Sequence, residues 1–254
     1  IKLIIIINML SESIVVPAEY VSLAPIILPN KIYLNQYTEY IHQKRFVSKV
    51  YTILWFQLLF TFSYIGLCNQ YKPLQLFYSS QLGVNLIYCC MLLLLLSSCF
   101  LFCLFDSIRQ FPYNYLYLSG FTILITYPLG IFGVLLSSQT LLLSILSTTG
   151  IFTGLTIYSY QTKINYTMYG NILIILLYAL FMFGIFIPFF HIPILYTIYS
   201  VGGAVLFSFY IVYDTQLIIN CKNRELIYTV DDYVIAAVNL YLDFINLFIF
   251  MIDI

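Results

Sequence analysis

Long apolar runs that hold almost no charge constrain this chain more than any other feature of its sequence. They cover residues 50–68, 82–105, 115–136, 140–160, 170–190, 194–219 and 233–252. Each is close to the roughly 20 residues that a helix needs to cross the hydrocarbon core of a membrane. A transmembrane barrel would show short alternating segments instead. We therefore expect an all-α integral membrane protein with seven transmembrane helices, or six spans and a re-entrant seventh segment.

The composition excludes the other broad classes. Only 8% of the residues are charged and 62% are hydrophobic, whereas soluble domains are about 25% charged. A water-soluble domain of this length could not hide so much apolar surface, and a disordered chain would be poor in hydrophobic residues. The ten basic and ten acidic residues cancel, which leaves no basic surface for nucleic acid. The expected partner is the lipid bilayer.

Basic residues near the ends of the runs predict the orientation, because cytoplasmic loops are enriched in Lys and Arg. Seven of these residues fall on one side of the predicted bundle: Lys44, Arg45, Lys49, Arg109, Lys163, Lys222 and Arg224. Only Lys72 falls on the other side. The N-terminus should therefore face the cytosol. We expect residues 1–45 to form a cytosolic arm, partly disordered, and residues 46–254 to form the membrane domain.

Residues that commonly bind metals or act as nucleophiles are poorly placed for either task. Five of the six cysteines lie in apolar runs, and Cys221 falls in a predicted cytosolic loop where thiols stay reduced. The two histidines, His42 and His191, are far apart in the sequence. We expect neither a zinc site nor a Ser-His-Asp triad, no cofactor, and no enzymatic activity.

Two acidic residues stand inside apolar runs. Asp214 lies in the sixth and Asp243 in the seventh, and none of the seven runs contains Lys or Arg. An aspartate at the centre of a membrane costs about 2.5–3.5 kcal/mol on insertion scales, so some interaction must offset that cost. If neighbouring helices bring the two together, both cannot ionise cheaply and they titrate as a unit. Alternatively, each is a protonated side chain that holds helices together.

The seventh run carries further polar residues at helical spacing. Asp232, Asn239, Asp243 and Asn246 follow one another at intervals of seven, four and three residues. These intervals place all four on one face of a helix. We therefore expect a polar face on this helix, with Asn239 and Asn246 supporting Asp243.

Several segments resemble the Bax-inhibitor/lifeguard family, which includes the Golgi anti-apoptotic proteins. The similar segments are residues 46–58, Arg109 with Pro112 and Asn114, residues 161–167, Tyr213-Asp214-Thr215-Gln216, and residues 231–243. The resemblance runs from about residue 46 to residue 252. Its last part is the most specific.

This resemblance implies a helical bundle in endoplasmic reticulum or Golgi membranes that acts as a pH-sensitive calcium leak and inhibits apoptosis. By the same similarity, Asp214 and Asp243 would form the paired proton sensor of the pore and bind calcium transiently as it passes. Asp231 and Asp232 would lie at the approach to the pore. Carboxylate oxygens suit calcium, which is a hard cation, and acidic rings favour cations over anions.

The sequence departs from the family pattern at two positions. Family members usually carry a glutamate in the third helix, where residues 124–127 contain no acid. Asn165 stands where an aspartate is common. A mechanism that needs the third-helix carboxylate would not operate here.

Other functions fit the sequence less well. An intramembrane aspartyl protease requires Gly-x-Gly-Asp and Pro-Ala-Leu motifs, and neither occurs. A seven-helix receptor would end its third helix with an acidic-Arg-Tyr triplet, which is also missing. The remaining alternative is a non-conducting membrane regulator that binds other channels or apoptosis regulators.

Overall fold

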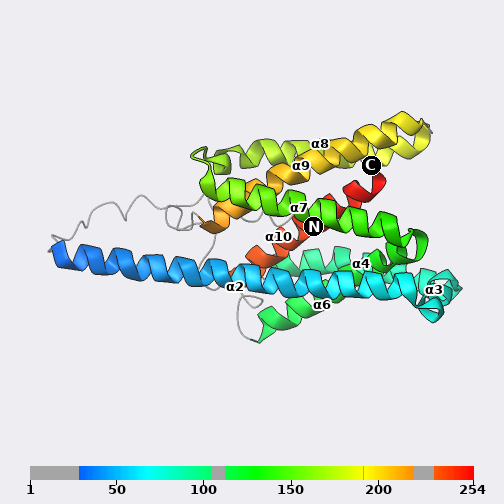
Figure 1. Ribbon diagram of the computed structural model, residues 1–254, viewed down its shortest axis with the longest axis horizontal. Coiled ribbons are helices and arrows are strands. Elements are labelled where there is room, and N and C mark those ends of the chain that lie inside the picture. The colour runs from blue at the N-terminus through cyan, green and yellow to red at the C-terminus, as the bar shows by residue number, and fades with distance from the viewer. Residues whose placement is uncertain (1–28, 104–111, 191, 220–231) are drawn as a thin grey trace.

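A computed structural model describes residues 29–103, 112–190, 192–219 and 232–254, and all regular structure within these ranges is helical (Figure 1). Six of the helices are long and apolar enough to cross a membrane, and a bent helix pair makes a seventh span if it is counted as one. The prediction of an all-α transmembrane bundle is therefore confirmed.

The first span belongs to a helix that is much longer than the predicted run over 50–68. Helix α2 covers Pro29–Gln70, 42 residues, and its N-terminal part projects beyond the bundle (Figure 1). Proline is tolerated in the first turn of a helix, and no other proline interrupts this segment. Residues 29–45 of the predicted arm are thus helical, whereas residues 1–28 lie outside the described residues.

The second predicted span corresponds to a pair of helices with a sharp bend between them. Helix α3 (Lys72–Ser79) and helix α4 (Gln81–Cys103) meet at a bend of 76°. Hydropathy placed this span at 82–105 and missed α3, which is short and starts at a Lys-Pro pair. The bend requires Gly83, because a Cβ there would lie 2.1 Å from the carbonyl oxygen of Phe77.

The other spans lie close to their predicted positions. They are α6 (Tyr113–Leu135), α7 (Ser138–Gln161), α8 (Gly170–Phe190), α9 (Pro193–Ile219) and α10 (Tyr233–Asp253), and a short 3-10 helix, η2 (Tyr166–Tyr169), precedes α8. At 21 residues, α10 is about 31 Å long. That length is enough to cross a hydrocarbon core of about 30 Å, so the structure favours a seventh span over a re-entrant segment.

Helix α10 forms the centre of the bundle. It packs against α9, α2, α7 and α6, and most of its side chains are buried. Phe244 and Phe248 stack edge-on against Phe62 of α2, with ring centroids 5.7 and 5.2 Å away. Helix α8 lies at the other extreme, with most of its apolar side chains exposed. Such exposed apolar surface is suited to contact with lipid.

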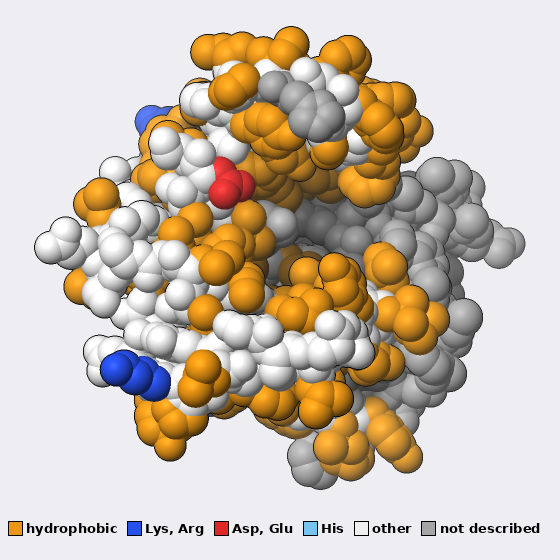
Figure 2. Space-filling view, turned by 90° about the vertical axis from the view of Figure 1, so that its right-hand side faces the viewer, with side chains coloured by type: hydrophobic (Ala, Val, Ile, Leu, Met, Phe, Trp, Pro, Cys, Tyr) orange, Lys and Arg blue, Asp and Glu red, His pale blue; other side chains and the backbone are white. Residues whose placement is uncertain are grey.

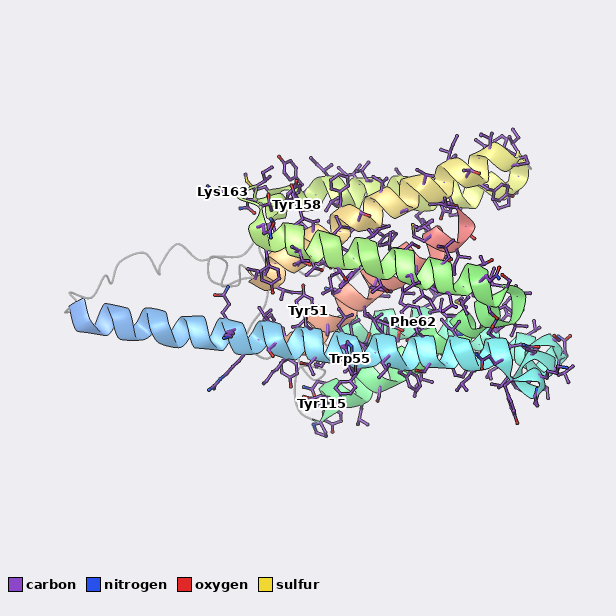
Figure 3. All side chains as sticks on the ribbon, viewed as in Figure 1. Tyr51, Trp55, Phe62, Tyr115, Tyr158 and Lys163 are labelled. Atoms are coloured by element: carbon purple, nitrogen blue, oxygen red, sulfur yellow. The ribbon has the colours of Figure 1, made fainter. Side chains whose placement is uncertain are left out.

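The basic residues that the structure describes lie toward the two ends of the bundle, as the sequence predicted. Lys163 lies at the same end as the projecting part of α2, and α3, with Lys72, lies at the other end (Figures 1 and 3). Figure 2 looks onto this second end, where hydrophobic side chains dominate. Arg109, Lys222 and Arg224 fall outside the described residues.

Candidate functional site

Both aspartates of the predicted pair lie inside the bundle. Asp214 on α9 is 3% exposed and Asp243 on α10 is fully buried. The two helices run in opposite directions (Figure 1) and make the most extensive helix–helix contact in the described part of the chain. Neither helix carries a Lys or Arg. The structure therefore places both acids in the core of a membrane protein.

Aromatic packing sets the register between α9 and α10. Phe250 of α10 stacks on Phe207, with ring centroids 5.8 Å apart, and it also fills the space beside Gly203, where a Cβ would lie 2.4 Å from its ring. Phe250 also contacts Tyr199, so its contacts on α9 centre on Gly203. Extending this antiparallel register by 1.5 Å per residue places Asp214 and Asp243 about 6 Å apart along the helix axes. The two acids thus lie within about one helical turn of each other along the bundle.

The remaining predicted residues follow the same helix. Asp232, just before α10, is 1% exposed and Asn239 is 2% exposed, so both lie inside the bundle. Asn246 is half-buried, and its Nδ2 donates to the carbonyl oxygen of Leu242 in the preceding turn, at 2.7 Å. Asp231 lies outside the described residues. The predicted polar face of α10 is therefore enclosed by other helices for most of its length.

Hydrogen bonds from two other helices hold α9 beside Asp214. The hydroxyl of Tyr51 on α2 donates to Thr215 Oγ1 at 3.5 Å, and Ser159 Oγ on α7 donates to the carbonyl oxygen of Val212 at 3.1 Å. These contacts involve the residue after Asp214 and the residue two before it. The backbone that carries Asp214 is thus fixed from both sides.

Gln216 attaches the end of α9 to the loop between α7 and η2. Its Oε1 accepts from the backbone N–H of Tyr166 at 2.7 Å, and its Nε2 donates to the carbonyl oxygen of Ile164 at 2.8 Å. In the same loop, Asn165 Oδ1 accepts from the N–H of Thr167 at 3.2 Å and caps η2. A cap needs only a side-chain acceptor, so asparagine can replace the aspartate that is common in the family.

A second group of polar residues, which the sequence analysis did not identify, lies between α2, α6 and α10. Thr61 Oγ1 lies 2.8 Å from the hydroxyl of Tyr241 and 3.0 Å from Thr126 Oγ1. One turn away, Gln57 Nε2 donates to Thr122 Oγ1 at 2.9 Å. All five side chains are at least 94% buried. We refer to these residues (Gln57, Thr61, Thr122, Thr126 and Tyr241) as the hydroxyl cluster.

One member of the hydroxyl cluster, Thr126, lies within residues 124–127 of α6, which contain no acid. A signal for the cluster was present, because Gln57 and Thr61 are four residues apart in one apolar run and Thr122 and Thr126 are four apart in another. Such spacing puts two side chains on one helix face.

Aromatic and basic side chains meet at the N-terminal end of α10. Lys49 Nζ of α2 lies 4.7 Å from the ring centroid of Tyr233, a distance typical of a cation–π contact. The Tyr233 hydroxyl accepts from Asn114 Nδ2 at 3.3 Å and donates to the hydroxyl of Tyr115, also at 3.3 Å. Asp232 precedes Tyr233 in the chain, so this cluster fixes the first turn of α10 and the Asp232 at its N-cap position.

The chemistry of these groups suits ions and protons better than bond-breaking. No three His, Cys, Asp or Glu side chains come together to hold a metal ion within the described ranges. What α9 and α10 offer instead is two buried acids on neighbouring helices that carry no basic residue. This arrangement defines a class: an α-helical membrane protein with acidic residues buried in its core.

Comparison with known proteins identifies the family within that class. A family model described as "Inhibitor of apoptosis-promoting Bax1" matches residues 43–254. The chain is 31% identical over 219 residues to the Arabidopsis thaliana protein LIFEGUARD 4, covering 82% of this chain and 83% of the relative. It is 26% identical over 212 residues to human Protein lifeguard 3, covering 82% of this chain and 67% of the relative.

The chain belongs to the Bax-inhibitor/lifeguard family, as its motifs predicted. Membership indicates an anti-apoptotic function. The family description names inhibition of a pro-apoptotic protein, which is a regulatory rather than a catalytic function.

Proposed function

We propose that this protein is a pH-sensitive calcium leak channel of the endoplasmic reticulum or Golgi membrane, which lowers stored calcium and thereby inhibits apoptosis. The observation that carries the proposal is the placement of Asp214 and Asp243, both at least 97% buried, within about one helical turn of each other on the two helices in most extensive contact. Calcium is the permeant ion and the protein holds no cofactor.

The acid pair supplies the dependence on pH. Two carboxylates side by side in a medium of low dielectric constant cannot both ionise cheaply, so the pair exchanges one proton as a unit. Loss of that proton adds a negative charge between α9 and α10. The two carboxylates then repel each other, whereas the shared proton had joined them. The packing of the two helices therefore responds to pH.

The same carboxylates give the selectivity. A pair with net negative charge attracts cations, and its oxygens are the ligands that calcium prefers. Calcium would contact Asp214 and Asp243 transiently as it passes, and Asp231 and Asp232 at the N-terminal end of α10 would attract it to the approach. We place this end, with the projecting part of α2, in the cytosol.

A second candidate function rests on a different observation. The N-terminal part of α2 projects beyond the bundle (Figure 1), where it could bind a channel or an apoptosis regulator. In that case the protein would regulate cell death without conducting ions, and the buried acids would serve to hold helices together.

Calcium flux through purified protein distinguishes the two candidates. The chain is reconstituted in liposomes loaded with a calcium dye, and leak is measured across a series of pH values. We expect a leak whose rate depends on pH, and we expect Asp214→Asn or Asp243→Asn to flatten that dependence, because an amide cannot exchange the proton. Asp253→Asn is the matched control, since Asp253 is on the same helix but exposed.

Leak no faster than in protein-free liposomes would contradict the channel. The regulator would then be supported if the same chain still protects cells from an apoptotic stimulus and loses that protection when residues 29–42 are deleted. Unchanged pH dependence in both aspartate variants, with leak preserved, would instead reject the proton sensor alone.

A further inference from the structure

A groove of about 650 Å³ lies between α2 and α6. Its walls come from residues 53–60 of α2 and residues 112–123 of α6. Tyr115, labelled in Figure 3, lies at the N-terminal end of α6 and lines this end of the groove. On α6 the lining extends over about 16 Å, at 1.5 Å per residue.

The lining is mostly apolar, uncharged and partly aromatic. Phe56 and Phe60 of α2 are 60% and 49% exposed, so their rings are available to a ligand. No Lys, Arg, Asp or Glu contributes to the lining. Both helices cross the membrane, so the groove faces the hydrocarbon region, and its volume is within the range of about 300–1,000 Å³ typical of ligand sites.

Ser119 Oγ is an exposed polar atom of the groove that can accept a hydrogen bond from a ligand, whereas Gln57 Oε1, which has no hydrogen-bond partner among the described residues, is buried. Ser119 is exposed in the lining, and its hydroxyl donates to the carbonyl oxygen of Leu116 at 3.0 Å. A serine oxygen has two lone pairs in addition to its single donor, so Ser119 Oγ can still accept. It lies one helical turn from Tyr115, whose hydroxyl accepts from Tyr233 beside Lys49. Tyrosine and lysine side chains of this kind mark the interfacial level of a membrane.

We propose that this groove binds a membrane sterol. The single sterol hydroxyl donates to Ser119 Oγ near the interface, the fused rings lie against Phe56 and Phe60, and the tail continues into the bilayer. A sterol is uncharged, as the lining is. Its rigid rings lose little conformational freedom on binding to a preformed groove, whereas a flexible acyl chain loses more.

Other occupants fit this groove less well. A transmembrane helix about 10 Å across would fill roughly 1,250 Å³ over a length of 16 Å, about twice the volume of the groove. A phospholipid would bring a charged head group to a lining that has no charge to pair with it. The proposal does not depend on whether the chain conducts calcium.

Photolabelling of the full chain tests the proposal. The protein is reconstituted in phosphatidylcholine vesicles with a photoreactive cholesterol analogue, and labelled peptides are mapped by mass spectrometry. We expect labelling on the groove residues of α2 and α6 that excess cholesterol suppresses and excess dioleoylglycerol does not. Loss of one neutral hydrogen bond should weaken sterol binding about three- to tenfold in Ser119→Ala, and Ser119→Phe should abolish labelling by filling the groove.

Thr153→Ala is the matched control. Thr153 is an exposed residue of α7, and its hydroxyl donates to the carbonyl oxygen of Thr149 in the same helix. Ser119 makes the same kind of bond within α6. Removal of the Thr153 hydroxyl should leave the labelling unchanged. The proposal is overturned if labelling is spread over the exposed face of α8, if dioleoylglycerol competes as well as cholesterol, or if both Ser119 variants label like the wild type.

Discussion

A single hydroxyl, that of Thr61, connects three helices of the bundle. It contacts Tyr241 of α10 and Thr126 of α6, and it also lies 2.9 Å from the carbonyl oxygen of Gln57 one turn earlier on α2. In hydrocarbon no water can replace these contacts. Thr148 of α7 is just as buried, but its hydroxyl donates only within its own helix, at 2.7 Å to Ser144. Removing the Thr148 hydroxyl therefore tests the loss of a buried hydroxyl alone. Removing the Thr61 hydroxyl also tests the loss of hydrogen bonds between helices.

We predict that Thr61→Val destabilises the protein more than Thr148→Val does. Valine keeps the shape of threonine, so the difference reports the interhelical hydrogen bonds. Leaving a buried hydroxyl without its partner costs about 1–3 kcal/mol, while hydrogen bonds between membrane helices average about 0.6 kcal/mol. We expect a difference of about 1 kcal/mol in the free energy of unfolding in mixed detergent micelles. Equal values for the two variants would show that the hydroxyl cluster does not stabilise the bundle.

At the scale of the element, α2 and α6 approach each other closely over their C-terminal halves. A Cβ at Gly133 would lie 2.3 Å from the carbonyl oxygen of Ile65, so the backbones touch at this point. Asn69 reinforces the contact, because its Nδ2 donates to the carbonyl oxygens of Gly133 and Leu136 at 2.9 and 3.0 Å. Small residues that permit such an approach, joined by polar contacts, are typical of helix pairs in membranes.

We predict opposite effects for alanine at two glycines within helices. Gly133→Ala should lower the free energy of unfolding by about 1–3 kcal/mol, because the methyl group forces the backbones of α2 and α6 apart. Gly150→Ala should raise it by up to about 1 kcal/mol, since alanine favours helix and a Cβ at Gly150 would meet nothing within 4 Å. Thermal unfolding of both variants in one detergent provides the measurement. A neutral Gly133→Ala would contradict the close approach.

The elements themselves could be predicted well where hydropathy alone decides. Spans such as α9 and α10 were placed to within about one or two residues, because runs of this length have few other solutions in a membrane. Helix α3 was missed because its eight residues carry a lysine and a proline at the start. The start of α2 was missed because a helix continuing beyond the membrane leaves no mark in hydropathy.

The candidate site was predictable in part for a related reason. Asp214 and Asp243 are conspicuous in the sequence because a charge in an apolar run needs an explanation. Thr61 and Tyr241 are not conspicuous in the sequence. A hydroxyl in a transmembrane helix costs little free energy, and the two residues that bond here are 180 positions apart. Which helix faces which is decided by tertiary packing, and no local pattern reports it.

At the scale of the whole molecule, the arrangement of charges makes the orientation in the membrane testable. Lys163 and Lys72 are both exposed and lie toward opposite ends of the bundle. Basic residues favour the cytoplasmic side, and the end with Lys163 also carries Lys44, Arg45 and Lys49 near the start of the first span. The end with Lys72 should therefore face the lumen.

We predict that a cysteine replacing Lys163 reacts with a membrane-impermeant maleimide added to the cytosolic side, and that one replacing Lys72 does not. Labelling is measured in cells in which only the plasma membrane has been permeabilised. The labelling of the unmodified chain is subtracted, because its native cysteines also react. Permeabilising all membranes should then expose Lys72→Cys as well, which controls for the reactivity of that position. The reverse pattern would place the projecting end of α2 in the lumen. Asp232, at the proposed approach to the pore, would then also face the lumen.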